Sequence, residues 1–266
     1  MRIILVSALV FLFACNSADK KEDKEQLKVA GAFKLLSQNV KSDISDTTYT
    51  SLQQLKIFTE DQMMYANVNS PDSLSGFGVG DYTIKGDTVI EHVIFAASDS
   101  VKDDTSRIYT LMIEKTPKGY KQVIPDIGGV GDTLHFKLTE DYETAGTDSK
   151  TPLDGVWKMT REIAINGKDT TEVKGTQYKA IYAGHVIWAH SYADSLKKNH
   201  TGIGIGKFEM TGDNKAKESI TASTYYQTRG SSFDLDIAMN GKDEFTQTII
   251  FQDGSKGIET YQRLKK

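Results

Sequence analysis

Apolar residues alternate with polar or small ones along much of the chain, and this period of two predicts β-strands. In the run 233–239, apolar side chains stand at Phe233, Leu235, Ile237 and Met239. Similar alternation recurs in the runs 109–113, 157–165 and 245–251. Turn dipeptides separate such runs: Gly86-Asp87, Asn166-Gly167, Gly212-Asp213, Asn240-Gly241 and Asp253-Gly254. No stretch beyond the first fifteen residues keeps a helical period, so we expect an all-β protein of short antiparallel strands.

The chain also repeats itself at a spacing of about 124 residues. Four blocks match in order: Gly31-Ala-Phe33-Lys34 with Gly155-Val-Trp157-Lys158, Gln54-Leu-Lys56-Ile-Phe58 with Gln177-Tyr-Lys179-Ala-Ile181, Met63-Met64-Tyr65-Ala66 with Val186-Ile187-Trp188-Ala189, and the stretch 76–87 with the stretch 202–213. We therefore expect two domains of one fold, at 29–143 and 153–266, joined by a polar linker at 144–152. About eight strands in each copy indicate a small barrel or a sandwich.

Each copy contains a Gly-x-Gly-x-Gly run inside a predicted strand, at Gly76–Gly80 and Gly202–Gly206. In a strand these glycines leave one face bare, which permits strong curvature or the close approach of another backbone. A dinucleotide-binding loop would need a further glycine and a following helix. Asp81 and Lys207 stand where that glycine belongs, so the strand interpretation is favoured.

The first fourteen residues have the pattern of an export signal. Arg2 precedes the apolar run 3–13, which as a helix would span about 16 Å, well short of a ~30 Å hydrocarbon core. The run ends in Leu12-Phe13-Ala14-Cys15, which resembles the lipobox of bacterial lipoproteins, although Phe13 is larger than the usual residue. The resemblance implies a signal peptide at 1–14.

It also implies a lipidated Cys15 and a charged, flexible tether at 15–28. Asn16 stands where many inner-membrane lipoproteins have Asp, which favours the outer membrane of a bacterial envelope. Which side of that membrane carries the protein stays open. The alternative is an ordinary secretory signal with an incidental cysteine.

Residues at both ends of each repeat resemble the lipocalin pattern. Gly155-Val-Trp157 opens the second copy and Arg263 lies near its end. In lipocalins a Gly-x-Trp closes one end of an eight-stranded barrel and a terminal arginine packs across the indole. The resemblance implies two tandem small antiparallel β-barrels of lipocalin-like, or calycin, type. The first copy departs from the pattern, with Phe33 in place of Trp and Lys137 as the basic residue near its end.

Four residues of the second copy are candidates for a ligand pocket: Arg161, Trp188, His190 and Tyr226. We expect Arg161 to point inward with Trp157, where an anionic ligand head group or an internal carboxylate would balance it. His190 beside Trp188 is the one candidate haem ligand, and a hydrogen-bonded or surface histidine is the alternative. Tyr226 would line the mouth or pack at a strand end.

Composition narrows the functions further. Lys and Arg total 32 against 36 Asp and Glu, giving a net charge of −4 without a basic cluster, which argues against nucleic acid as a partner. The single cysteine excludes disulfide frameworks and cysteine-based metal sites within one chain. No metalloprotease, serine-hydrolase or phosphate-loop motif occurs.

We therefore expect no cofactor, no metal and no catalysis. The leading hypothesis is a membrane-anchored envelope lipoprotein that binds a small hydrophobic or amphipathic ligand in one or both barrels. The alternative is a structural module with filled barrels whose outer surface meets another envelope protein.

Overall fold

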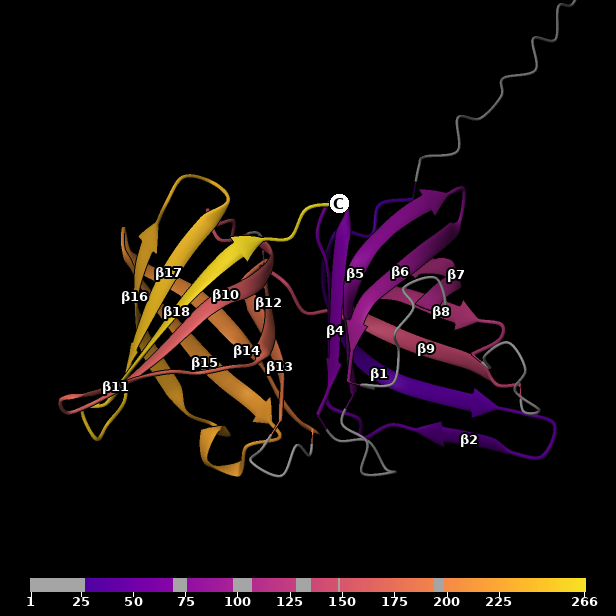
Figure 1. Ribbon diagram of the computed structural model, residues 1–266. Helices are drawn as coiled ribbons and strands as arrows, with labels where there is room; N and C mark the ends of the chain where they lie inside the picture. Colours follow the sequence, from indigo (N-terminus) through magenta and orange to yellow (C-terminus); the bar gives the residue numbers. More distant parts are fainter. Residues whose placement is uncertain (1–26, 69–75, 98–106, 128–134, 148, 194–198) are drawn as a thin grey trace, which may run out of the picture.

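The computed structural model describes residues 27–68, 76–97, 107–127, 135–147, 149–193 and 199–266. The predicted signal peptide, Cys15 and nearly all of the tether lie outside these residues. The described chain forms two closed eight-stranded antiparallel β-barrels in tandem, which confirms the predicted fold class (Figure 1). Among the described residues, no helix is both long enough and apolar enough to cross a membrane.

Barrel 1 is a meander that closes on itself. Its ring runs β1-β3-β4-β5-β6-β7-β8-β9, and β9 pairs back with β1. The short β2 pairs only with the far half of β1 and stands outside the ring. The strands are β1 (Gly31–Lys41), β2 (Asp46–Tyr49), β3 (Gln54–Phe58), β4 (Gln62–Asn67), β5 (Gly76–Lys85), β6 (Thr88–Ala96), β7 (Ile108–Thr116), β8 (Gly119–Ile124) and β9 (Lys137–Thr144).

Barrel 2 repeats this topology strand for strand. Its ring runs β10-β12-β13-β14-β15-β16-β17-β18 and closes by pairing β18 with β10, while β11 stands outside. The strands are β10 (Gly155–Asn166), β11 (Asp169–Glu172), β12 (Thr176–Tyr182), β13 (His185–Ala193), β14 (Asn199–Gly212), β15 (Lys215–Ser223), β16 (Ser232–Met239), β17 (Glu244–Ile250) and β18 (Lys256–Arg263), with a 3₁₀ turn, η2 (Tyr226–Thr228), after β15.

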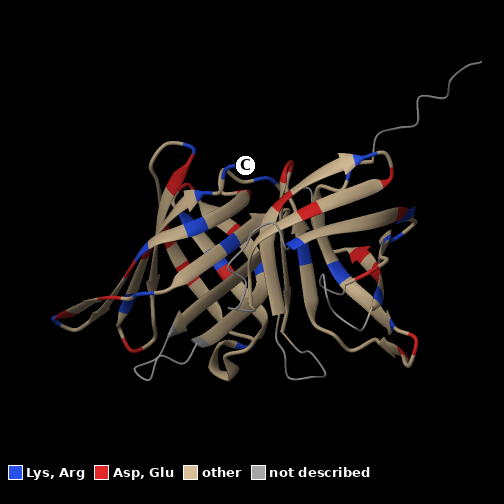
Figure 2. Cartoon of the chain, turned by 45° about the vertical axis from the view of Figure 1, so that its right-hand side comes forward, with Lys and Arg blue, Asp and Glu red and all other residues tan. Residues whose placement is uncertain are grey.

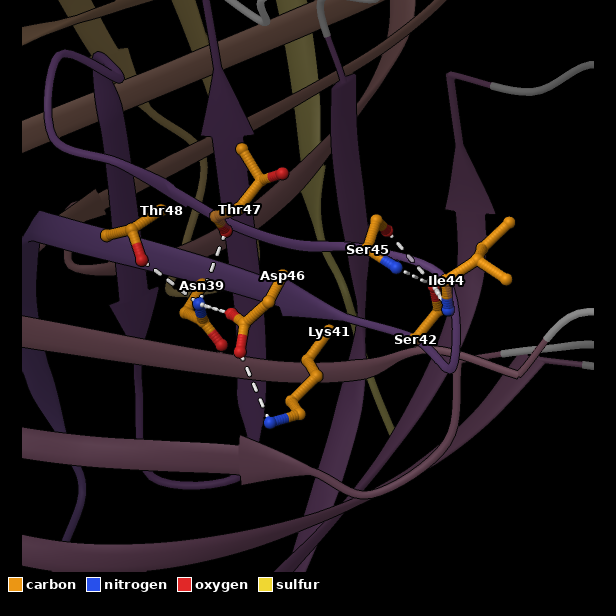
Figure 3. A network of polar contacts seen from close by, with 8 residues as sticks. All are labelled: Asn39, Lys41, Ser42, Ile44, Ser45, Asp46, Thr47 and Thr48. Atoms are coloured by element: carbon orange, nitrogen blue, oxygen red, sulfur yellow. Dashed lines mark hydrogen bonds and ion pairs between the residues drawn. The ribbon is translucent and has the colours of Figure 1, made fainter.

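The β1–β2 hairpin projects from barrel 1 and is held by its own polar side chains (Figure 3). The Asn39 amide donates to Asp46 Oδ1 at 2.7 Å and to Thr48 Oγ1 at 3.0 Å, and Lys41 pairs with Asp46 at 3.2 Å. The Ser42 hydroxyl accepts from the amide of Ser45 and closes the tip. Such local bonds substitute for packing, because the hairpin has little of the barrel to bury against.

The two barrels pack directly against each other through the outer faces of β3 to β5 and β12 to β14 (Figure 1). A fully buried cluster joins them, formed by Ala32, Leu55, Ile57, Met64, Ala66, Val68, Phe77, Val79, Val156, Tyr178, Ala180, Ile187, Ala189, Ile203, Ile205 and Ala222. This contact explains why every residue of β3 is buried: one face lines the barrel and the other meets the second barrel.

The end of the chain also bridges the barrels. After β18 the Leu264 amide donates to Val156 O at 2.8 Å in barrel 2. The Gln62 side-chain amide of barrel 1 donates to the Leu264 carbonyl, and Lys266 Nζ donates to Tyr82 O at 3.1 Å. The C-terminus therefore lies between the barrels (Figure 1).

One end of barrel 2 is closed by Trp157 and Arg263. The indole is fully buried, meets Phe245 edge-on at 4.7 Å between centroids, and donates from Nε1 to Leu153 O at 2.8 Å. The Arg263 guanidinium lies 4.0 Å from the indole centroid, and its Nη1 donates to Asp154 O at 2.6 Å. Cation–π attraction and hydrogen bonds therefore act on one side chain.

Barrel 1 closes the equivalent end with aromatic rings alone. Phe33 meets Tyr120 edge-on at 4.8 Å and Phe58 at 6.5 Å. Thr144 stands opposite Phe33, where Arg263 stands opposite Trp157. Lys137, the basic residue near the end of this copy, begins β9 at its far end, paired with Lys41, so this barrel end closes without a basic residue opposite Phe33.

Replacing Arg263 by alanine is expected to lower the free energy of unfolding of barrel 2 by about 2 kcal/mol, because the cation–π contact and the bonds to Asp154 and Pro152 are lost together. Urea unfolding followed by tryptophan fluorescence measures the loss, since both tryptophans lie in barrel 2. The matched control is Lys265→Ala, which removes only an exposed ion pair with Asp243. Equal effects of the two substitutions would contradict this account of barrel closure.

Candidate functional site

A β-bulge decides which side chains of the first strand face the barrel interior. The register of β10 against β18 shifts between Met159 and Arg161, and β1 has the same shift between Leu35 and Ser37. A bulge adds one residue and exchanges the inner and outer faces beyond it. Beyond the bulge Glu162 therefore faces the interior of barrel 2, and Gln38 faces the interior of barrel 1.

The interior of barrel 1 has a layer of hydrogen-bonded polar side chains centred on Lys56. Lys56 is only 2% exposed. Its Nζ lies 2.7 Å from Glu91 Oε1 and donates to Gln122 Oε1 at 3.2 Å. Gln122 in turn donates to Glu140. We call this group the polar layer of barrel 1; it comprises Gln54, Lys56, Glu91, Gln122, Glu140 and Tyr142.

Barrel 2 contains the same layer at equivalent strand positions. Lys179, also 2% exposed, lies 2.9 Å from Glu218 and donates to Gln247 Oε1 at 3.1 Å. Gln247 donates to Glu259 Oε2 at 2.8 Å. The polar layer of barrel 2 comprises Gln177, Lys179, Glu218, Gln247, Glu259 and Tyr261.

In each polar layer a tyrosine hydroxyl donates a hydrogen bond to a glutamate. The Tyr142 hydroxyl donates to Glu140 Oε2 at 3.1 Å, and Tyr261 donates likewise to Glu259. Burial, together with the adjacent glutamate, raises the pKa of each tyrosine well above its usual value, so both hydroxyls stay protonated and remain donors. A carboxylate inside a barrel is tolerated when it is hydrogen-bonded, and Glu140 and Glu259 each accept from several side chains.

The polar layer divides each barrel into two halves. On one side lies the closed half, filled by apolar and aromatic side chains around Phe33 or Trp157. On the other side lies a cavity in the open half. In barrel 1 this cavity measures about 330 Å³ and is lined by the polar layer together with Gln38, Tyr65, Asn67, Gly76, Tyr109, Ile124, Ile127 and Leu138. The wall therefore combines hydrogen-bonding groups with apolar surface.

The corresponding cavity of barrel 2 is smaller, about 160 Å³. Trp188 and His190 stand where barrel 1 has Tyr65 and Asn67, and larger side chains fill more of the space. Other lining residues outside the polar layer are Glu162, Thr228, Phe233, Ile249 and Phe251. His190 contacts Gln177 Oε1 through Nδ1 at 3.2 Å and the Tyr225 hydroxyl through Nε2 at 2.5 Å, and burial lowers its pKa.

The glycine-rich strands make room for these rings. A Cβ added at Gly204 would collide with the Trp188 ring, and one at Gly78 with the Tyr65 ring. At Gly80 and Gly206 the collision would be with backbone of the neighbouring strand, next to a register shift. The expected close approach of another backbone is thus found at Gly80 and Gly206, whereas Gly78 and Gly204 are covered by aromatic rings.

The candidate pocket residues fall into two groups. Trp188 and His190 line the cavity of barrel 2. The inward placement of Arg161 is wrong: its side chain is 60% exposed and lies 3.7 Å from Glu172, because the bulge turns it outward. Tyr226 is also misplaced, since it is 83% exposed in η2 and its neighbour Tyr225 reaches His190 instead. Phe33, Trp157 and Arg263 lie in the closed halves, away from both cavities.

Sequence reasoning missed the polar layers, although a signal was present. The matched blocks Gln54-Leu-Lys56 and Gln177-Tyr-Lys179 keep the same two polar residues inside strands whose other positions are apolar. The pairs Glu140 with Tyr142 and Glu259 with Tyr261 repeat in the same way near the end of each copy. Polar identities that persist between two otherwise divergent copies, at positions of strand period, indicate inward-facing partners.

The barrel cavities differ from the other candidate features of the described residues. No group of three or more His, Cys, Asp or Glu able to hold a metal occurs in the part of the chain that the structure describes. A broad open hollow of about 1410 Å³ lies beside β16 and the ends of β15 and β17. It lacks the converging buried polar groups of the barrel interiors, so we take the cavities as the candidate sites.

Comparisons with known proteins add no argument to the fold or the site. No protein-family model matches the chain, and no curated protein matches it. Among solved structures, the chain is similar to a crystal structure from Bacteroides fragilis, provisionally described as an outer membrane protein. The alignment covers 88% of this chain and 98% of that one at 10% identity, with a TM-score of 0.28. A likeness this distant carries no argument about function.

Proposed function

We propose that this protein is a lipid-anchored lipoprotein of the bacterial envelope that binds a small amphipathic molecule in the open half of one or both barrels, without catalysing a reaction. The observation that carries the proposal is the division of each barrel into a filled half and a cavity whose wall mixes apolar surface with oriented polar groups. Such walls are typical of small-molecule sites. The eight-stranded meander also fits the lipocalin resemblance.

The proposed envelope location rests on the lipobox-like segment near the N-terminus. The lipobox-like Leu12-Phe13-Ala14-Cys15 and the charged tether after it support an anchor that holds the barrels near a membrane surface. Figure 2 agrees with a protein that does not bind nucleic acid, since Lys and Arg are interspersed with Asp and Glu over both barrels.

The competing function is a structural or protein-interaction module. Its support is that each polar layer is hydrogen-bonded within itself and that the second cavity is small. The two functions differ in one respect: a module with filled barrels holds no ligand, whereas a carrier or sensor does.

Native mass spectrometry of the full-length protein, released gently from membranes, is expected to show a small-molecule adduct that disappears after organic extraction. Ile124→Trp fills the cavity of barrel 1 and Ile249→Trp that of barrel 2, because the two positions are equivalent and both line cavities. If one barrel binds, the substitution in that barrel should abolish the adduct; if both bind, each substitution should halve its stoichiometry and the double variant should abolish it. Met112→Trp, at an exposed position, is the control that should retain it. A bare mass for the unextracted protein would favour the structural module.

A further inference from the structure

The two cavities differ in charge, and this difference bears on what the second one binds. The cavity of barrel 1 is lined by two carboxylates, Glu91 and Glu140, and one ammonium, Lys56. The cavity of barrel 2 is lined by three carboxylates and one ammonium. The additional carboxylate is Glu162, which occupies the position of Gln38 in barrel 1.

Having Glu162 in barrel 2 where barrel 1 has Gln38 removes a hydrogen bond and adds a negative charge. In barrel 1 the Gln38 amide donates to Glu140 Oε1 at 2.7 Å. In barrel 2 Glu162 stands directly opposite Glu259 in the register of β10 and β18, so that two carboxylates replace a donor and an acceptor. Within the described residues the Glu162 carboxylate has no hydrogen bond and no ion pair, although the Glu162 backbone carbonyl accepts from the Val173 amide at 3.0 Å.

The protein groups around Glu162 do not balance its charge. Lys179 is held by Glu218 and Gln247. His190 is bonded to Gln177 and Tyr225, and its burial disfavours the charged form. Glu259 already accepts from Gln177, Gln247 and Tyr261. A formal charge of −2 therefore remains on the lining of this cavity.

Aromatic rings complete the cavity. Trp188, Phe233 and Phe251 line it with Glu162, and Phe233 meets Phe251 edge-on at 6.3 Å. Trp188 stacks on Tyr225, with 6.1 Å between the ring centroids. Aromatic faces attract organic cations and repel anions, and the attraction strengthens when water is excluded. Carboxylates and aromatic rings together are suited to a positively charged head group on an apolar stem.

We propose that the cavity of barrel 2 recognises an organic ammonium ion, with Glu162 accepting hydrogen bonds from the ammonium group and Trp188, Phe233 and Phe251 packing around its alkyl or aryl part. The inference rests on the proposed binding function and narrows it to one ligand chemistry. It also replaces the expectation of an anionic head group, because Arg161, the residue on which that expectation depended, points away from the cavity.

Three six-carbon probes with one alkyl chain and different head groups test the inference. Calorimetric titration uses the full-length protein in an alkyl maltoside, a detergent without charge, with hexylamine, 1-hexanol and hexanoate at pH 8. Hexylamine is expected to bind at least tenfold more tightly than 1-hexanol, and hexanoate most weakly. Equal affinities, or tighter binding of hexanoate, would overturn the ammonium inference and leave the proposed function standing. Failure of all three to bind would also overturn it, while the native mass measurement decides the proposed function separately.

Substitution of Glu162 tests the same point within the protein. Glu162→Gln, which reproduces the residue of barrel 1, is expected to weaken hexylamine binding about tenfold or more and to leave 1-hexanol binding unchanged. Glu172→Gln is the matched control, because Glu172 lies on the neighbouring β11 with its carboxylate in solvent. An unchanged hexylamine affinity in Glu162→Gln would contradict the assignment.

The pH dependence supplies a further readout. Burial and the neighbouring Glu259 raise the pKa of Glu162 to about 7. The other charged or titratable groups around the cavity are Glu218 and Lys179 from β15 and β12, His190 from β13 and Tyr225 from the turn after β15. Alkylammonium ions stay protonated throughout this range, so hexylamine binding should strengthen as the pH rises from 6 to 8.5. Glu162→Gln should flatten that profile.

Discussion

Replacing Lys179 by methionine is expected to lower the free energy of unfolding of barrel 2 by about 3–5 kcal/mol. The substitution keeps the length of the side chain and removes its charge, and Glu218 is then left 5% exposed without the ammonium that lies 2.9 Å from it. Gln247 loses the donor to its Oε1 at the same time. Breaking a buried ion pair from one side costs more than the pair itself contributes, because an uncompensated charge stays inside.

Urea unfolding followed by the fluorescence of Trp157 and Trp188 measures this effect, since both residues report on barrel 2. The double variant Lys179→Met/Glu218→Leu supplies the control. Removing both charges should recover at least half of the loss, because no isolated carboxylate remains. If the single variant loses less than about 1 kcal/mol, Lys179 is not the centre of the polar layer.

The second large effect concerns the contact between the barrels. Ile57→Asp is expected to lower the free energy of unfolding by about 4 kcal/mol or to separate the barrels, because it places a carboxylate in a fully buried apolar cluster. Ile57 lies on β3, whose outer face meets barrel 2. Small-angle scattering distinguishes the two results, since separated barrels have a larger radius of gyration at unchanged secondary structure.

Ile108→Asp is the matched control, with the same substitution at a position that is 55% exposed. It should change neither the stability by more than about 0.5 kcal/mol nor the radius of gyration. Comparable losses for the two variants would mean that the barrels do not depend on each other for burial of β3.

The repeat and the alternating pattern were sufficient to predict two tandem all-β domains, because strand period and turn chemistry are local properties of the chain. They left a barrel or a sandwich open, and the lipocalin resemblance implied the barrels. The contact between barrels was not predicted. At the level of the polar layers, strands β3 and β12 carry apolar residues on the outer face and polar residues on the inner face. A barrel in water usually has the opposite arrangement, with apolar residues inside and polar residues outside. Only the position of the second barrel explains why Leu55 and Ile57 face outward.

Only part of the candidate site was predicted from the sequence, because strand alternation places some of its residues and not others. Trp188 and His190 lie on a regular strand, where alternation places a side chain reliably. Arg161 lies one residue beyond a bulge, which exchanges the two faces and cannot be read from alternation alone. Glu162, the residue after it, therefore lines the cavity. Tyr226 lies in a short turn, where no periodic rule applies.

The polar layers also explain how one fold can serve binding. Each layer is a network of hydrogen bonds and one buried ion pair between the filled half and the cavity, and the same six positions build it in both copies. Next to this layer the walls are free to differ, and they do so at Gln38 and Glu162, Tyr65 and Trp188, and Asn67 and His190. The two barrels thus share the polar layer and differ in the side chains that line the cavity next to it.

A crystal structure of the full-length protein, purified without organic solvent, tests the central claim most directly. We expect electron density for a small molecule in the open half of at least one barrel, in contact with the polar layer and, in barrel 2, with Glu162 and Trp188. Two open halves that hold only ordered water, bonded to the polar layers, would contradict the binding function and leave a structural role for both barrels.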